Sequence, residues 1–199
     1  MSRAFCFDLD GTITATEILP CVASELGVSD EIATLTRATM DGHIDFESSL
    51  RLRCLVLGQV PPERVDAIVS HVPLNDAILS FIQAHRENAF IVTGNLDIWI
   101  RTIADRCGCA AFSSQATYEG SQLRLQKILC KADAVATLRK RGFDEIVAIG
   151  DGANDVPMLS VADIAIAYGG VHLPAAPARA AAHYIIHEGE TLCRLLTAL

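Results

Sequence analysis

The chain has 199 residues, of which 51% are hydrophobic and 20% charged, and its formal net charge is −8 at pH 7. This composition is typical of one globular domain with a real core, with room for a small insertion. The negative charge argues against a general nucleic-acid binder, which normally carries a basic surface. No apolar segment reaches the roughly 18 residues of a membrane helix, and early acids argue against a secretory leader. We therefore expect a soluble, cytoplasmic protein with no nucleic-acid or membrane partner.

Five short apolar runs are predicted as strands. Each is of strand length, rich in Val, Ile, Phe or Ala, and not alternating, which favours strands covered on both faces of a parallel sheet. The runs are residues 4–7, 89–92, 110–112, 146–149 and 164–167. Segments with helical spacing lie between them, for example residues 78–85 and 134–141. This alternation predicts an α/β fold with a doubly wound, mostly parallel, Rossmann-like sheet.

Residues 17–72 do not follow the alternation. They contain helical candidates separated by Gly27, Gly42 and a turn at residues 58–62, with no clear strand. A small helical cap inserted after the first strand is the simplest interpretation. The predicted division assigns residues 1–14 and 75–199 to the α/β core and residues 15–74 to the cap. Farther along the chain, residues 118–121 predict a hairpin turn.

Seven cysteines are scattered along the chain, and most lie inside apolar runs. Their odd number favours buried free thiols over disulfides or a metal cluster. Cys107 and Cys109 are separated by one residue, not by the two that are expected of a zinc knuckle. His183 and His187 flank the strand-like segment Tyr184–Ile186, so we interpret both as surface residues.

Acidic residues follow the first predicted strand, in Phe7-Asp8-Leu9-Asp10-Gly11-Thr12. Asp8 and Asp10 are two residues apart and would point the same way on a strand. At the carboxyl end of a strand they would face the ligand crevice of an open α/β sheet. Because close carboxylates repel, such a pair indicates a bound cation or a shared proton. A solvated acidic turn is the alternative.

The strand at residues 146–149 also ends in acids and small residues, in Gly150-Asp151-Gly152-Ala153-Asn154-Asp155. A helix is predicted to follow, because Pro157 is tolerated in a first helical turn. Asn154 or Asp155 could cap that helix. A cap would explain one acid but not Asp151 and Asp155 together.

The strand at residues 89–92 ends in Thr93-Gly94-Asn95, which offers a hydroxyl and free backbone N–H groups. Taken singly, Thr93 would be a turn residue, but three polar strand ends in one sheet indicate a site. A phosphate group would also need a fixed cation, which a lysine supplies as a point charge. Lys127 and Lys131 both precede the helix before the strand at residues 146–149, so both are candidates.

These motifs, D-x-D-G-T, Thr-Gly, Lys and G-D-G-x-N-D, occur in the order found in the haloacid dehalogenase superfamily of phosphohydrolases, which the chain resembles. The resemblance spans the α/β body and implies a Mg²⁺-dependent phosphatase or phosphotransferase that works through an aspartyl-phosphate. It implies that Asp8 is the nucleophile and that Asp10 is the general acid and then the base. It also implies that Thr93 and a lysine hold phosphoryl oxygens. We assign Lys131, which opens a helical segment, with Lys127 as the alternative.

The resemblance further implies a Mg²⁺ site made of Asp8, the backbone carbonyl of Asp10, and Asp151. Asp155 would support this site, and Asn154 would lie near the substrate. Mg²⁺ takes oxygen ligands together with a substrate phosphate, and an acid cluster of this kind supplies them. Phosphoryl transfer requires mainly positioning and neutralisation of charge, which agrees with these roles.

The predicted cap contains a second motif, M-x-G-x-x-x-F-x-x-S-L-x-x-R, from Met40 to Arg53. This spacing, with Glu17 before it, is similar to the cap of phosphoserine phosphatases. The resemblance implies that Glu17 and Arg53 bind the ammonium and carboxylate of phosphoserine. Met40 and Phe46 would close over the ligand, with Gly94 beside it. The alternative is an amphipathic helix with Arg53 in an ordinary salt bridge.

Three places depart from the phosphoserine phosphatase pattern. Gly11 replaces a usual Ser, Asn95 replaces a second Gly, and residues 168–172 differ from the segment common there. None of these changes removes a charged group, so the chemistry should be kept. The leading prediction is a phosphatase for a small phosphorylated metabolite such as phosphoserine. The alternatives are another small phosphomonoester, phosphate transfer to an alcohol such as homoserine, or a catalytically silent phosphate- or metal-binding protein.

Overall fold

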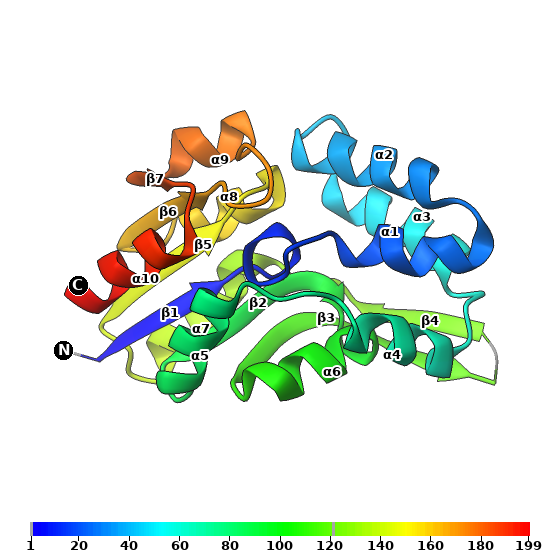
Figure 1. The fold of residues 1–199 in the computed structure, drawn as a ribbon, viewed down its shortest axis with the longest axis horizontal. Helices are drawn as coiled ribbons and strands as arrows, with labels where there is room; N and C mark the ends of the chain where they lie inside the picture. The colour runs from blue at the N-terminus through cyan, green and yellow to red at the C-terminus, as the bar shows by residue number, and fades with distance from the viewer. Residues whose placement is uncertain (1, 121) are drawn as a thin grey trace.

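The structure is a computed structural model that describes residues 2–120 and 122–199. Its centre is a seven-stranded sheet in the order β4-β3-β2-β1-β5-β6-β7 (Figure 1). The strands are β1 (Arg3–Phe7), β2 (Ala89–Leu96), β3 (Ala110–Glu119), β4 (Gln122–Lys127), β5 (Glu145–Gly150), β6 (Ile164–Tyr168) and β7 (Tyr184–Ile186). All neighbours are parallel except β3 and β4, which are antiparallel. The predicted doubly wound, mostly parallel α/β fold is confirmed.

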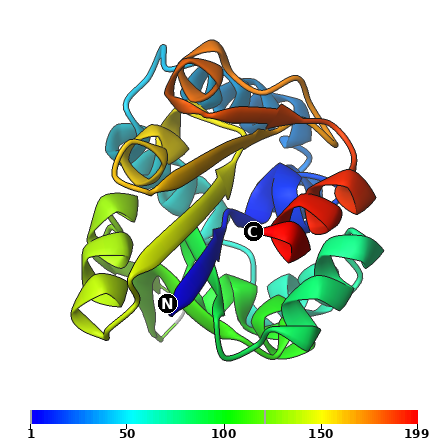
Figure 2. The same ribbon diagram turned by 90° about the vertical axis from the view of Figure 1, so that its left-hand side faces the viewer.

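Helices cover both faces of the sheet (Figure 2). On one face lie α5 (Asp76–Ala84), α6 (Asp97–Cys107) and α10 (Gly189–Ala198), and on the other lie α7 (Lys131–Lys140), α8 (Val156–Leu159) and α9 (Ala176–Ala181). Successive residues of β1 therefore enter two different cores. Phe5 and Phe7 pack with α5 and α6, whereas Ala4 and Cys6 pack with α7 and α8. This double burial explains why the strand sequences are apolar throughout instead of alternating.

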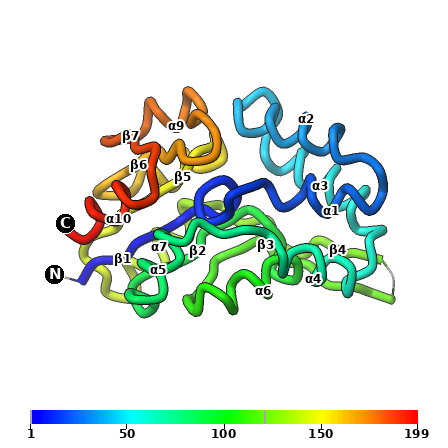
Figure 3. Tube along the Cα trace, in the orientation of Figure 1, coloured from blue at the N-terminus to red at the C-terminus, as the bar shows by residue number. Residues whose placement is uncertain are grey.

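The regular elements between β1 and α5 are all helical. They are a compact helical turn at Leu9–Ile13, α1 (Ile18–Ala23), a short turn at Ser24–Leu26, α2 (Ser29–Met40), α3 (Phe46–Leu57) and α4 (Pro62–Ser70). Helices α2 and α3 lie over the ends of the central strands (Figures 1 and 3). Thr14 and Leu74 form an isolated antiparallel bridge, so the segments before α1 and after α4 lie side by side. Helix α4 also packs against α6 of the body. The division at residues 15–74 stays a prediction.

Two local expectations differ in detail from the structure. β3 is longer than the predicted run at residues 110–112, because its second half extends beyond its pairing with β2 and pairs with β4 as a hairpin. The predicted turn lies at this hairpin, although Ser121 is outside the described residues. The seven cysteines are free thiols, as predicted. Cys6, Cys54 and Cys107 are buried and three others are half-buried, but Cys130 is exposed, so the prediction of a buried thiol is wrong there. His183 and His187 are exposed, as predicted.

Within residues 2–120 and 122–199, we find no helix with the length and hydropathy to cross a membrane.

Candidate active site

The loops after β1 and β5, which contain the two aspartate-rich motifs, lie side by side at the centre of the sheet. β1 and β5 are parallel neighbours, with Phe7 opposite Ile149, and the backbone N–H of Asp8 donates to the carbonyl of Ile149 at 2.8 Å. From this pair the chain winds outward in both directions along the sheet. Such a point leaves a crevice beyond the carboxyl ends of the strands. Asp8 follows β1 and Asp151 follows β5, so both lie at this crevice.

Asp8 and Asp10 do not lie on the strand itself. β1 ends at Phe7, and Leu9–Ile13 form a compact turn. Strand alternation therefore does not set the direction of these side chains, and that part of the sequence argument is wrong. The turn depends on Gly11, whose φ of 72° is readily adopted only by glycine.

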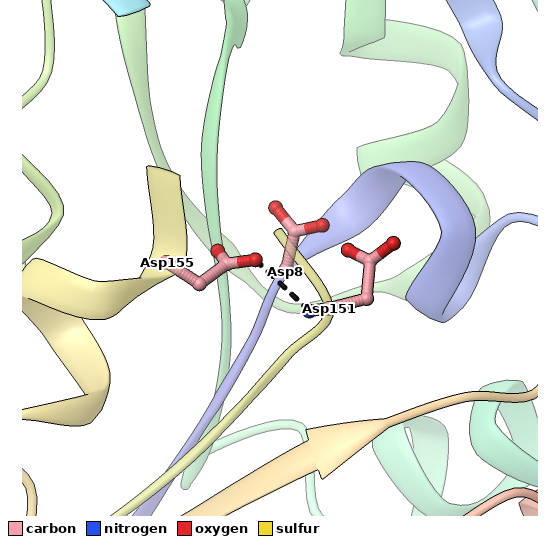
Figure 4. Close-up of side chains that lie close together, drawn as sticks. All are labelled: Asp8, Asp151 and Asp155. Carbon is pink, nitrogen blue, oxygen red and sulfur yellow. Dashed lines mark hydrogen bonds between the residues drawn. The ribbon is translucent and has the colours of Figure 1, made fainter. Parts of the chain in front are cut away.

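Three buried aspartates form the centre of the site. Carboxylate oxygens of Asp8, Asp151 and Asp155 lie within 4.8 Å of one another (Figure 4). Asp155 is fixed by the backbone, because its Oδ2 accepts from the N–H groups of Asp151 at 3.0 Å and Gly152 at 2.9 Å. Lys131 forms buried ion pairs with Asp8 and Asp155. One ammonium thus faces three carboxylates, so the cluster has more negative than positive groups.

The surroundings make ionisation of Asp8 and Asp151 unfavourable. Burial raises the pKa of Asp8 well above its usual range, with Asp155 adding to this effect and Lys131 opposing it. Burial and the charge of Asp8 likewise raise the pKa of Asp151. The Oδ2 atom of Asp151 is buried and has no hydrogen-bond partner in the described part of the chain. A hard divalent cation such as Mg²⁺ would satisfy this oxygen and offset the excess negative charge, so the donor set fits that ion.

The two candidate lysines have different environments. Lys131 is the first residue of α7, and its side chain is only 3% exposed. Burial lowers its pKa, but Asp155 and Asp8 outweigh this effect and hold the pKa above its usual value. Lys127 is exposed at the end of β4. The geometry therefore favours Lys131 as the phosphate-binding cation.

The end of β2 brings three further residues to the site. Thr93 is buried, and its Oγ1 accepts from the backbone N–H of Asn95 at 3.1 Å. The Nδ2 of Asn95 donates to Oδ2 of Asp10 at 2.8 Å. Gly94 lies directly under the ring of Phe46 from the cap, because a Cβ atom there would be 2.0 Å from the ring. Only glycine allows this close contact between the body and the cap.

Both oxygens of Asp10 accept hydrogen bonds, since its Oδ1 also accepts from the N–H of Ile18 at 2.9 Å. Burial raises the pKa of Asp10 to about 7, and the charge of Glu17 adds to the effect. Both protonation states are therefore populated near neutral pH, which is what a general acid and base requires.

These residues surround one narrow cavity between the α/β body and the cap. Its volume is about 50 Å³, on a scale where one water occupies about 10–15 Å³. Most predicted site residues line it, namely Asp8, Asp10, Glu17, Met40, Phe46, Arg53, Thr93, Gly94, Asp151 and Asn154. The other two do not line the cavity but contact residues that do. Lys131 forms an ion pair with Asp8, and Asp155 lies beside Asp8 and Asp151. The structure thus brings the whole predicted set together.

The cap contributes a buried cation, Arg53, which is 6% exposed. Its Nη2 donates to Oγ1 of Thr39 at 3.0 Å, and that hydroxyl is 2.6 Å from Oγ of Ser49. Its Nε has no partner, and the guanidinium forms no ion pair with an acid, among the residues that the structure describes. Burial lowers the pKa of Arg53, and the charges of Asp10 and Glu17 oppose this effect without forming an ion pair with it. An anionic group in the cavity would further stabilise this buried charge. The sequence analysis did not identify Thr39 and Ser49 as site residues. The only feature that could have indicated them is a hydroxyl group on the apolar side of each helix.

A third residue missed from the sequence contacts Glu17 without itself lining the cavity. Nε2 of His172, in the loop after β6, is 3.3 Å from Oε1 of Glu17. The neighbouring carboxylate of Glu17 raises the pKa of His172. The sequence marked residues 168–172 as unusual but gave no indication of this contact, which joins positions far apart in the chain.

Residues 5–160 match the haloacid dehalogenase-like hydrolase family. The chain belongs to this family, as its motifs predicted.

Within the family, the chain is similar to phosphoserine phosphatases along most of its length. It is 27% identical over 179 residues to phosphoserine phosphatase of Methanocaldococcus jannaschii, which covers 83% of this chain and 85% of that protein. It is 29% identical over 174 residues to phosphoserine phosphatase of Lactococcus lactis, covering 81% of each. A solved structure described as a phospho-aspartyl intermediate analogue of phosphoserine phosphatase has the same fold. The TM-score is 0.84, with 24% identity and coverage of 100% of this chain and 98% of that chain.

Proposed function

We propose that this chain is a Mg²⁺-dependent phosphatase that hydrolyses a small amino-acid phosphomonoester, with phosphoserine as the leading substrate. The observation that carries the proposal is the composition of one cavity. Arg53, a buried cation without an acid partner, and Glu17 line the same cavity as Asp8. An amino-acid headgroup carries one carboxylate and one ammonium, which are the complementary charges, and arginine can bind a carboxylate through two N–H groups. The similarity to phosphoserine phosphatases supports the same substrate.

In the first step, a carboxylate oxygen of Asp8 attacks the phosphorus. The new O–P bond forms as the bond between phosphorus and the ester oxygen breaks. Asp10 gives its proton to the leaving oxygen, which departs as an alcohol. Lys131 and the Thr93 hydroxyl hold the phosphoryl oxygens, since Thr93 already accepts from a backbone N–H and has its own proton free to donate.

In the second step, the aspartyl-phosphate on Asp8 is hydrolysed. Asp10, now a carboxylate, takes a proton from a water molecule, whose oxygen attacks the phosphorus. The bond from phosphorus to Asp8 then breaks, so that inorganic phosphate and the free carboxylate are restored. The ring of Phe46 over Gly94 excludes other acceptors while the intermediate exists.

The residues that would hold Mg²⁺ are Asp8, the carbonyl of Asp10, and Asp151, with Asp155 in support. When bound, the ion supplies positive charge that favours the ionised aspartates and offsets the charge of the phosphoryl group. The proposal is consistent with the unpartnered Oδ2 of Asp151 and with the raised pKa values of Asp8 and Asp151.

The test is phosphate release with Mg²⁺ from a panel that contains O-phospho-L-serine, O-phosphoethanolamine, sugar phosphates and nucleotides. O-phosphoethanolamine lacks the carboxylate that Arg53 would bind. We expect a preference for phosphoserine, and we expect Arg53→Leu to lower its kcat/KM by about a hundredfold. Arg51→Leu is the matched control, because Arg51 lies on the same helix but is 59% exposed. Activity on other esters but not on phosphoserine would be consistent with the Asp8 chemistry and would refute the headgroup assignment.

A further inference from the structure

Asn95 is tied to two of the groups that would act on the ester. Its backbone N–H donates to the hydroxyl of Thr93, and its Nδ2 donates to Asp10. The side chain is 6% exposed, so it is not a surface amide that happens to meet a carboxylate. One residue therefore fixes the positions of the phosphate-binding hydroxyl and of the acid that protonates the leaving group.

The other end of the same amide has no assigned role. Oδ1 of Asn95 is buried and accepts no hydrogen bond from the residues described. An unpartnered buried acceptor is unfavourable, and native proteins rarely keep one without a reason. Asn95 lines the cavity together with Glu17 and Arg53, so a ligand in the cavity is the available source of a donor.

We propose that Asn95 determines substrate specificity, with its Oδ1 accepting a hydrogen bond from an ammonium group next to the ester carbon of the substrate. This inference rests on the proposed function. It extends that function by naming the substrate class, phosphate esters of vicinal amino alcohols, and by giving the ammonium a second acceptor besides Glu17.

The position of Asn95 supports an ammonium as the donor. An ammonium has three N–H groups, and when it is buried each of them needs an acceptor. Glu17 supplies one acceptor group, and its nearest cation in the described residues, His172, is 43% exposed and can be displaced. Because Nδ2 and Oδ1 belong to one planar amide, Oδ1 lies close to the acid that protonates the ester oxygen. A donor on the neighbouring carbon, as in serine, suits this distance better than one farther away.

The test compares two substrates that differ only in the amine. O-phospho-L-serine has it, and 3-(phosphonooxy)propanoate lacks it but keeps the carboxylate and the ester. We would measure kcat and KM for both with wild type, Asn95→Leu and Asn95→Gly. Leucine has a similar size without the amide, and glycine removes the side chain without adding bulk if the leucine variant does not fold.

Removal of the amide is expected to disturb Asp10 equally for both substrates, so the ratio of their kcat/KM values reports on the ammonium alone. We expect this ratio to fall by about ten- to a hundredfold in both variants, the usual effect of one hydrogen bond to a charged group. Equal losses for the two substrates would overturn the inference and leave Asn95 as a positioning residue for Asp10. Wild type that does not hydrolyse phosphoserine would instead refute the proposed function itself.

Discussion

Replacement of Asp8, the proposed nucleophile, should make the metal-free protein more stable while it abolishes activity. Asp8→Asn removes one of three buried carboxylates whose oxygens lie within 4.8 Å. Each repulsion that is lost is worth at least about 3.5 kcal/mol at an effective dielectric constant of about 20. The attraction to Lys131 that is lost is worth about 6 kcal/mol at an ordinary charged hydrogen-bond distance. Two repulsions outweigh one attraction, and burial of a neutral amide costs less than burial of a charge. We expect a gain of about 1–3 kcal/mol in the free energy of unfolding.

Urea denaturation in EDTA, followed by circular dichroism, measures this gain. The pKa of Asp8 is raised in the folded state, so the unfolded chain releases the Asp8 proton at a lower pH than the folded protein does. The folded wild type therefore loses stability as the pH rises above the unfolded pKa of about 4. The advantage of Asp8→Asn should therefore grow between about pH 4 and pH 7. Asp105→Asn is the control, since it removes the same charge from the exposed surface of α6 and should change stability by less than about 0.5 kcal/mol. A metal-free Asp8→Asn protein that is less stable than wild type at pH 7 would refute the electrostatic account.

Other substitutions test the remaining parts of the site. Lys131→Met leaves buried carboxylates unpaired, so it should lower the metal-free unfolding free energy by about 3–5 kcal/mol and kcat by at least about a hundredfold. Urea denaturation measures the loss of stability and phosphate release measures the loss of kcat. Unchanged stability would contradict the pairing of Lys131 with the buried carboxylates. His172 is protonated below its raised pKa and then competes with a substrate ammonium for Glu17. Asp10 and the substrate phosphate titrate in both proteins, so the comparison is the difference between their pH profiles. The wild-type KM for phosphoserine should rise more steeply than that of His172→Gln as the pH falls through the pKa of His172; parallel pH profiles would exclude the competition. Phe46→Ala should lower kcat/KM by about tenfold and increase transfer of phosphate to added methanol, because the cap no longer seals Gly94. Leu55→Ala, at a site 74% exposed, is the control, and equal transfer in both variants would argue against a seal.

The sheet could be predicted from the sequence because its central strands are buried on both faces. Four strands appear as continuous apolar runs, and only their ends shift by a few residues. The strand β3 was predicted only at its start. Its second half alternates between exposed and buried residues and pairs with β4 outside the parallel sheet, so no continuous apolar run marks it.

The site could be predicted where its residues follow strand ends in short motifs. The turn after β1 could not, because period-two alternation ceases at Phe7 and the direction of Asp10 depends on a left-handed glycine. The contact of Asn95 with Asp10 joins residues 85 positions apart, and no local pattern encodes a pair of that separation. For the same reason, the sequence marked Asn95 as unusual without assigning it a partner.

The two halves of the site have separate physical supports, and this separation bears on how substrate choice can change. The aspartates and Lys131 are held by the ends of β1 and β5 and by the start of α7, all parts of the α/β body. Arg53 is held instead by Thr39 and Ser49, which belong to the cap helices. Asn95 contacts both parts, since it donates to Asp10 of the body and lines the same cavity as Glu17 and Arg53. Under the proposed function, substitutions in the cap would alter the headgroup that is bound while the phosphoryl chemistry is kept. A substitution of Asn95 would not separate the two, because it also removes a hydrogen bond from Asp10.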